Sequence, residues 1–291
     1  MAQITPGASR FAGASPTQAG IVIALWGAVL LASLWSAMTR PARPDPPQIS
    51  ASTADRDEDL DLYRRISARI RLGEAYYPVA ADEQRRNHYP LRPFVTMRLP
   101  TLALLIAHIG IRPAHLLLLM LAILTVIIWY RRLRAILPPA VNAAAMAALL
   151  LPGMTLLASP TYVVLHEVWA GILIALALAV HRPDQWGRSL VIAGCALAMR
   201  ELALPFVLLM GAAALVHRRW AEGGGWALLV LGFGVLCYGH MVQVMAVVRP
   251  DGLASPPWTE FGGLPAALAF LHQSGGFRAF PAVIGYPLIM V

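Results

Sequence analysis

A series of long apolar runs, several of them followed by a cluster of arginines, constrains this chain more than any other feature. Most of the runs reach about 20 residues, the length at which a helix crosses a bilayer. Only 13% of the 291 residues are charged and 58% are hydrophobic, whereas soluble domains carry about 25% charged residues. We therefore predict an all-α, polytopic transmembrane helical bundle, whose apolar side chains face lipid and neighbouring helices.

The apolar runs divide the chain into crossings and loops. A first crossing at residues 20–38 follows a polar tail, 1–19. It exceeds the apolar stretch of about 7–15 residues in a signal peptide, so we expect an uncleaved anchor. A polar loop, 39–98, then precedes the bundle, 99–291. The further crossings are expected at residues 113–130, 137–157 (broken at Pro152-Gly153), 162–180, 189–216 and 224–247.

Three apolar or glycine-rich stretches do not make full crossings. Residues 101–109 are too short to span, and residues 249–277 form a loop rich in glycine and proline. Residues 279–291 begin another apolar run in which the chain stops. A helix cut off inside a membrane leaves carbonyl groups unsatisfied. We therefore expect a short or truncated chain.

The arginine clusters predict the orientation. They share one side of the membrane only if residues 189–216 enter and return as two half-length helices, whereas a single straight helix would put the last cluster on the opposite side. The positive-inside rule assigns this shared side to the cytoplasm. We therefore expect the tail 1–19 to be cytoplasmic and the loops 39–98 and 249–277 to be periplasmic. Arginine-rich, alanine-rich composition is typical of bacteria with GC-rich genomes, so we expect a multi-pass protein of the bacterial inner membrane. The clusters are Arg131, Arg132 and Arg134; Arg182 and Arg188; and Arg218 and Arg219.

The first periplasmic loop is expected to contain an amphipathic helix on the membrane surface. Acidic residues come first, arginines follow, and Gly73 ends the pattern, as the helix dipole favours. Tyr63, Ile66 and Ile70 recur at helical spacing. The acids either complement the helix N-terminus, which the residues alone favour, or hold a divalent cation such as Mg²⁺ or Mn²⁺, or act as a base. They are Asp55, Asp57, Glu58, Asp59 and Asp61.

Charged residues near the outer ends of the crossings are candidates for chemistry. His166-Glu167 begins a crossing, where ionisable groups are costly and therefore suggest function, although a hydrogen-bonded pair at the interface is the alternative. Arg200 and Glu201 form the expected hairpin tip and, as neighbours on a helix, do not face each other. At least one of them is expected to reach another helix or the site. The loop arginines Arg85, Arg86, Arg92 and Arg98 suit either phosphate oxygens or lipid headgroups.

These groups converge on one outer face under the hairpin topology, which predicts a cleft for a substrate with a lipid tail and an anionic head. The net charge of +8 does not indicate nucleic-acid binding, because the arginines lie at the ends of apolar runs rather than on one solvated face. Cys195 and Cys237 lie inside apolar runs and are interpreted as packing residues.

The order of these features over roughly residues 15–220 resembles the C-type glycosyltransferases, polytopic enzymes that use polyprenyl-phosphate sugars. A first crossing leads into an outer loop with acids before an aromatic residue, Asp59-Leu-Asp61-Leu-Tyr63. Next comes a helix ending in Gly-Glu-Ala-Tyr76-Tyr77, and later a hairpin tip, Ala-x-x-x-Arg200-Glu201. Between these stand Tyr89-Pro90 and Arg98-Leu-Pro100-Thr101-Leu.

The resemblance implies transfer of a sugar from a polyprenyl-phosphate donor to an acceptor at the periplasmic face. In this family an acid of the first outer loop deprotonates the acceptor or helps to bind metal. Asp59 and Asp61 are the matching positions, and Asp59 is preferred because it begins the D-x-x-x-Y pattern. The expected substrate-binding residues are Tyr63, Arg85, Arg92, Arg98, His166, Glu167, Arg200 and Glu201.

Two alternatives stay open: a non-catalytic or degenerate member of the same fold, and a transporter of lipids or solutes. A transporter of this kind is expected to have broken helices at matching places in two halves. The sequence has one broken element and no internal repeat.

Overall fold

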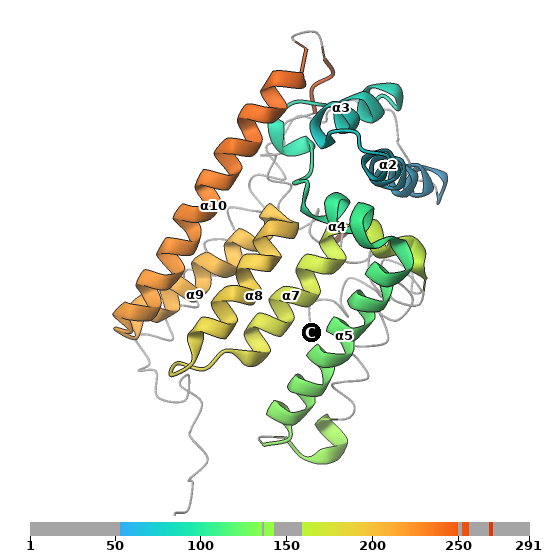
Figure 1. Cartoon of the computed structure of the whole chain (residues 1–291). Helices are drawn as coiled ribbons and strands as arrows, with labels where there is room; N and C mark the ends of the chain where they lie inside the picture. Colours follow the sequence, from blue (N-terminus) through green and yellow to red (C-terminus); the bar gives the residue numbers. More distant parts are fainter. Residues whose placement is uncertain (1–52, 136, 143–158, 250–251, 256–267, 270–291) are drawn as a thin grey trace, which may run out of the picture. The chain divides into compact units, whose positions relative to one another are not determined.

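The computed structural model describes residues 53–135, 137–142, 159–249, 252–255 and 268–269. Every named element in this part is a helix, and the only strand-like feature in it is an isolated bridge between Arg92 and Ala254. The all-α prediction is confirmed for the described residues (Figure 1). The tail 1–19, the crossing 20–38, most of the crossing 137–157, most of the loop 249–277 and the run 279–291 lie outside them.

The predicted helix of the first polar loop is confirmed as α2 (Thr53–Arg71). Gly73 follows it with a φ of +96°, a left-handed conformation that glycine adopts without strain. The buried side chains of Leu62 and Ile66 join a cluster with residues of α3 (Tyr76–Arg86). Arg69 of α2 pairs with three carboxylates, Glu74 at 2.5 Å, Asp82 at 2.7 Å and Glu83 at 2.9 Å. An apolar seam and an ion-pair network therefore join the two helices.

A short connection leads from α3 into the first long apolar helix. It contains the 3₁₀ turn η1 (Phe94–Thr96) and the nine-residue α4 (Thr101–Ile109), which is too short to span, as predicted. Gly110, with a φ of +85°, separates α4 from α5 (Ile111–Leu133). The expected crossing at residues 113–130 is therefore a 23-residue helix.

The expected crossing at residues 162–180 begins later than predicted. Ser159 accepts a hydrogen bond from the backbone of Thr161 and starts a 3₁₀ turn, η2 (Pro160–Val164). The α-helix proper, α7, runs over His166–Val180. This 3₁₀ turn therefore replaces the first turn of the expected helix, and the α-helix has 15 residues.

The hairpin prediction for residues 189–216 is confirmed, and the single straight helix is wrong. The chain forms α8 (Trp186–Met199), leaves helical geometry at Arg200, whose φ is −154°, turns through η3 (Glu201–Ala203) and continues as α9 (Leu204–Val216). Position 194 of α8 packs against Leu229 of α10 (Trp220–Val247), and position 225 against Trp186, so α8 and α10 run in the same direction. Positions 211 and 223 pack against Trp226 and Leu215, respectively, so α9 runs the opposite way. Figure 1 shows α7, α8, α9 and α10 side by side.

The hairpin brings the arginine clusters to one end of the bundle, which we call the basic end. Arg132 donates to the carbonyls of Leu178, Ala179 and His181, where α7 finishes. His181 in turn contacts Glu222 at the start of α10. The ends of α5 and α7 and the start of α10 are therefore joined, as the charge pattern predicted.

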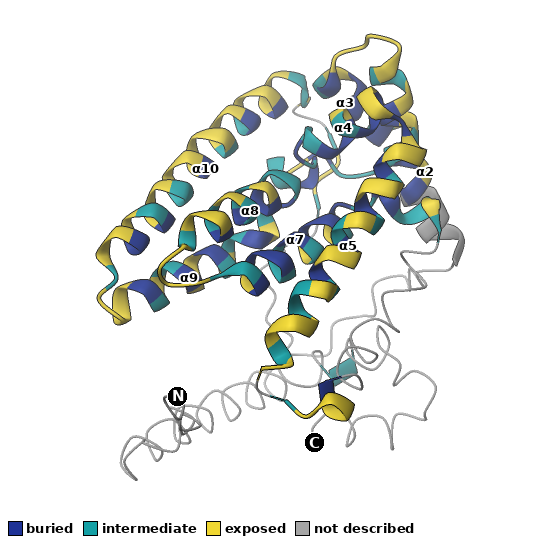
Figure 2. Ribbon diagram, turned by 60° about the horizontal axis from the view of Figure 1, so that its bottom comes forward, coloured by how far each residue is buried: buried dark blue, intermediate teal, exposed yellow. Residues whose placement is uncertain are grey.

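Two helices, α5 and α10, are long and apolar enough to cross a membrane. Only 22% and 17% of their most apolar windows are buried, whereas the core helix of a soluble protein is mostly buried. Figure 2 shows exposed residues along the outer faces of both helices. The three helices between them have 15, 14 and 13 residues, or about 20–22 Å each, against about 42 Å for the 28 residues of α10.

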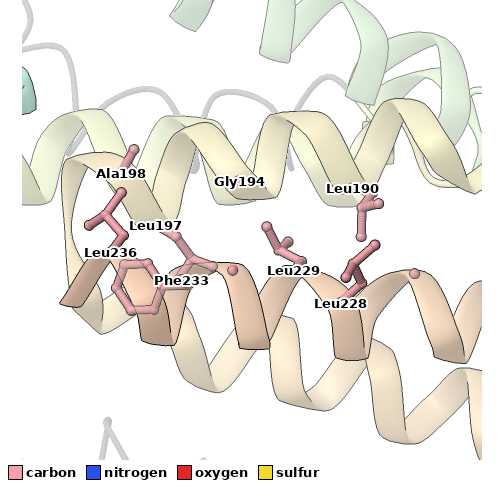
Figure 3. Close-up of a pocket in the computed structure, with 10 residues that line it drawn as sticks. Leu190, Gly194, Leu197, Ala198, Leu228, Leu229, Phe233 and Leu236 are labelled. Carbon is pink, nitrogen blue, oxygen red and sulfur yellow. The ribbon is translucent and has the colours of Figure 1, made fainter. Parts of the chain in front are cut away.

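The main core lies among α7, α8, α9 and α10 and includes the buried Leu197, Val207 and Trp226. Gly225 permits the close approach of α8, because a Cβ at this position would lie 2.4 Å from the Trp186 ring. Between α8 and α10 remains a cavity of about 340 Å³ lined only by Leu, Phe, Ala and Gly residues (Figure 3). Such a lining offers contacts to hydrocarbon but no group for chemistry.

Candidate functional site

A cluster of four charged residues, which we call the ion cluster, lies at the end of the bundle opposite the basic end. It consists of Arg98 before α4, Glu167 in the first turn of α7, and Arg200 and Glu201 at the hairpin tip. Oε1 of Glu167 lies 3.6 Å from Nη2 of Arg98 and 3.2 Å from Nη2 of Arg200. Nη1 of Arg200 lies 3.1 Å from Oε1 of Glu201. Three separate chain segments therefore meet through these side chains.

The two arginines of the ion cluster are much more buried than the carboxylate that they share. The side chain of Arg200 is 7% exposed and that of Arg98 is 20% exposed, against 47% for Glu167. The Nε atoms of both arginines are buried and have no hydrogen-bond partner. Buried donors without partners are costly, so the two guanidinium groups have N–H groups free to donate to a further anionic or carbonyl oxygen.

Tyr63 and His166 extend the ion cluster towards α2. Their rings meet edge to face with centroids 5.2 Å apart, and His166 is buried. Arg98 forms a side-chain hydrogen bond with Tyr63. Burial works against the charged form of Arg98, but Tyr63 and Glu167 outweigh it and raise the pKa of the guanidinium group. The arginine therefore stays a cation in the site.

Tyr76 of α3 fixes the backbone at Arg98. Its hydroxyl donates a 2.5 Å hydrogen bond to the Arg98 carbonyl. Burial raises the pKa of Tyr76, so its hydroxyl keeps the proton that it donates. This contact links the periplasmic-loop helices of the sequence prediction to the ion cluster.

His240 of α10 and its partner Tyr77 form a contact that was not predicted from the sequence. Nε2 of His240 lies 3.1 Å from the Met97 carbonyl, which only accepts, so Nε2 carries a proton. Nδ1 lies 3.2 Å from the Tyr77 hydroxyl, which donates to it when the imidazole is neutral. The pair attaches α10 to the segment just before Arg98. A histidine inside an apolar run is itself a signal for function, and that signal was available from the sequence.

The structure does not bring Arg85 and Arg92 into the ion cluster. Arg85 donates to the Val247 carbonyl at the end of α10, and Arg92 donates to the Gly252 carbonyl at 2.8 Å. Both side chains satisfy backbone carbonyls that a helix end and a turn leave open. Their structural role is therefore to hold the chain that follows α10.

The two acids expected to be catalytic lie differently on α2. Asp61 is exposed and pairs with Arg64 at 3.2 Å. Asp59 belongs to the described helix, but its side chain lies outside the described residues. It comes four residues before Tyr63, a spacing that places both positions on the same face of a helix. Asp61, two residues away from each, does not share that face.

The acidic side chains of the described residues do not form a metal-ion site among themselves. In the described ranges, no three His, Cys, Asp or Glu side chains form a group that could hold a cation. Glu167 and Glu201 both face guanidinium groups. The expected Mg²⁺ or Mn²⁺ site depends on Asp59 and Asp61, of which Asp61 is paired with Arg64.

Comparisons with known proteins returned no relative. No protein-family model matches the chain, and neither a curated protein nor a solved structure matches it.

Proposed function

We propose that the protein is a glycosyltransferase of the bacterial inner membrane that moves a sugar from a polyprenyl-phosphate donor to an acceptor at the periplasmic face. One observation carries the proposal: Arg98 and Arg200 form a largely buried pair of guanidinium groups around a single shared carboxylate oxygen. Guanidinium groups bind phosphate oxygens bidentately. The resemblance of the sequence to C-type glycosyltransferases supplies the reaction class.

The placement in a membrane rests on α5 and α10. Both helices are apolar, long and largely exposed, and lipid is the solvent in which such surfaces are stable. The short basic loops lie at the end where α5 finishes and α10 starts, and positive-inside makes that end cytoplasmic. The ion cluster is at the other end, so it faces the periplasm.

The shared oxygen of Glu167 marks the point at which a phosphate oxygen binds. It lies within 3.6 Å of Arg98 and 3.2 Å of Arg200, distances that a phosphate oxygen can reproduce. Glu167 is half exposed and can therefore move into solvent when the phosphate arrives. The unpartnered Nε atoms of both arginines then gain acceptors.

The transfer breaks the bond between the anomeric carbon and the phosphate oxygen. The acceptor oxygen bonds to that carbon, and its proton passes to a carboxylate, for which Asp59 is proposed. The polyprenyl phosphate leaves with an additional negative charge, which Arg98 and Arg200 stabilise. The edge-to-face pair of His166 and Tyr63 lies on the side of the site towards α2.

Matched substitutions in α2 test the base. The full chain is reconstituted in vesicles, and transfer is measured from a panel of radiolabelled polyprenyl-phosphate hexoses and pentoses. We expect Asp59→Asn to lower transfer by about 100-fold or more. Asp61→Asn is the control and should leave it near the wild-type rate, because Asp61 is exposed and paired with Arg64.

Wild-type transfer by Asp59→Asn would show that the base is assigned wrongly. Binding of the polyprenyl phosphate without transfer of any sugar would favour the non-catalytic alternative. Movement of the labelled lipid between leaflets without chemical change would favour the transporter.

A further inference from the structure

A cavity with a strongly basic lining lies at the basic end, away from the ion cluster. It has a volume of about 640 Å³ and lies between the end of α5, the end of α7 and the first turn of α8. Four guanidinium groups line it, and no acidic side chain of the described residues does so. We call it the arginine cavity; its lining residues are Ile128, Arg131, Arg132, Ala135, Ala179, Arg182 and Arg188.

One of the four arginines builds the wall of the cavity. Nη1 of Arg132 donates to the carbonyls of Leu178, Ala179 and His181 at distances of 2.9–3.0 Å. These carbonyl groups lie in the last turn of α7 and directly after it. Arg132 therefore fixes α5 against α7 and gives the cavity a defined shape.

The other three arginines have no counterion among the described residues. Within the described part of the chain, no hydrogen bond or ion pair engages the side chain of Arg131, Arg182 or Arg188. The nearby acid Glu222 is buried and pairs with His181 and Arg219. Like charges around one cavity repel unless an anion lies between them. The arrangement therefore favours a ligand with one or more phosphate groups.

An apolar surface continues from the cavity along α5. Ile128 lines the cavity, and the neighbouring Leu124 and Ile127 are exposed. Trp129 and Tyr130 stand at the same level, where aromatic residues mark the boundary of a bilayer. A phosphate site next to an exposed apolar surface matches the headgroup and the acyl chain of a phospholipid. A free anion would contact only the phosphate site.

We propose that the arginine cavity binds the headgroup of an anionic phospholipid of the cytoplasmic leaflet, with an acyl chain along the exposed face of α5. Basic pockets between membrane helices on this side of a bilayer recognise such headgroups. The site depends on α5 crossing the membrane and is independent of the transfer reaction at the other end. A lipid with two phosphates, such as cardiolipin, engages more of the guanidinium groups than phosphatidylglycerol does.

Native mass spectrometry of the full chain in detergent tests the proposal. Cardiolipin, phosphatidylglycerol, phosphatidylcholine and inorganic phosphate are titrated separately. We expect cardiolipin to bind most tightly and phosphatidylcholine to bind weakly. Each arginine neutralised should weaken cardiolipin binding about fivefold, so Arg182→Gln combined with Arg188→Gln should weaken it about 25-fold.

Arg218→Gln is the matched control, because Arg218 is exposed at the same end but does not line the cavity. It should leave cardiolipin binding within about twofold of wild type. An equal loss in the control, or wild-type binding by the double variant, would overturn the site. Equal affinity for inorganic phosphate with the same arginine dependence would make it a site for free anions and overturn the lipid assignment.

Discussion

The two ends of the helical bundle use arginine in opposite ways. At the basic end, Arg131, Arg182 and Arg188 are exposed and have no carboxylate partner among the described residues. At the ion cluster, Arg98 and Arg200 are largely buried and share Glu167. The residue type is the same, so its surroundings decide the role.

Burial sets the energetic difference between the ends. An exposed guanidinium group is solvated and contributes mainly to orientation and to attraction of anionic lipid. A buried one loses that solvation and needs a partner of opposite charge. Because burying charged groups is costly, we propose the ion cluster rather than the basic end as the centre of the reaction.

The largest expected effect is on the rate of transfer, when one arginine at each end is replaced in separate variants. Arg200→Gln removes a buried charge from the proposed phosphate site and should lower glycosyl transfer by about a thousandfold. Arg218→Gln removes an exposed charge and should leave transfer near wild type. Transfer rates and thermal midpoints are measured for both variants. A parallel loss of activity in the two variants would remove the distinction between the ends.

The one buried carboxylate at the basic end is an exception that sharpens the comparison. Glu222 is 1% exposed, lies 2.8 Å from both His181 and Arg219, and accepts from Trp226. Glu222→Gln leaves Arg219 without its partner and should lower the free energy of unfolding by about 3 kcal/mol. Asp184→Asn, an exposed change in the same region, should be neutral. Thermal unfolding in detergent distinguishes them.

The seam between α8 and α10 connects the two ends, and a pair of adjacent glycines tests its packing. A Cβ at Gly225 would lie 2.4 Å from Trp186, whereas nothing lies within 4 Å of a Cβ at Gly224. Gly225→Ala should therefore cost about 2 kcal/mol of stability. Gly224→Ala should gain up to about 1 kcal/mol, because alanine is the better helix former. The same sign for both changes in unfolding experiments would contradict the described seam.

The smallest effect is expected at the exposed network around Arg69. Its hydrogen bonds lower the pKa of Glu74 and of Asp82 below their usual values of 4.5 and 3.8. Carboxylates with lowered pKa values stabilise the fold above their unfolded pKa, and this contribution is lost as the pH falls through the folded pKa. The thermal midpoint should therefore fall below about pH 4.5, and less so in Arg69→Gln. Parallel pH curves for the two proteins would show that the network contributes no measurable stability.

The hairpin could be predicted from the sequence because arginine-rich loops are expected on one side of the membrane, and only a hairpin at residues 189–216 puts all three arginine clusters on that side. Arg200 and Glu201 were placed at the tip by that reasoning, and the structure has them there. The meeting of Arg98, His166, Glu167 and Tyr63 with that tip also followed from topology. Helix α2 was predicted from local pattern alone.

The individual partners could not be predicted in the same way. Arg85 and Arg98 both come from the polar segment 39–98 and were both expected to bind substrate, yet Arg85 contacts the end of α10 and Arg98 joins the ion cluster. Which partner each arginine contacts depends on the path of α10, and the local sequence around an arginine does not determine that path. His240 shows the same dependence, because its partners Tyr77 and Met97 are more than 140 residues away in the chain.

The unequal lengths of the helices have a consequence for the lipid around the protein. The hydrocarbon core of a bilayer is about 30 Å thick, whereas α7, α8 and α9 extend only about 20–22 Å. A bilayer adapts to short helices by thinning beside them. The outer leaflet is therefore expected to dip by roughly 8 Å on this flank. In the proposed function, this thinning would bring a lipid phosphate closer to Arg98 and Arg200 while its tail stays in the leaflet, so a long-chain donor would reach the site by lateral diffusion.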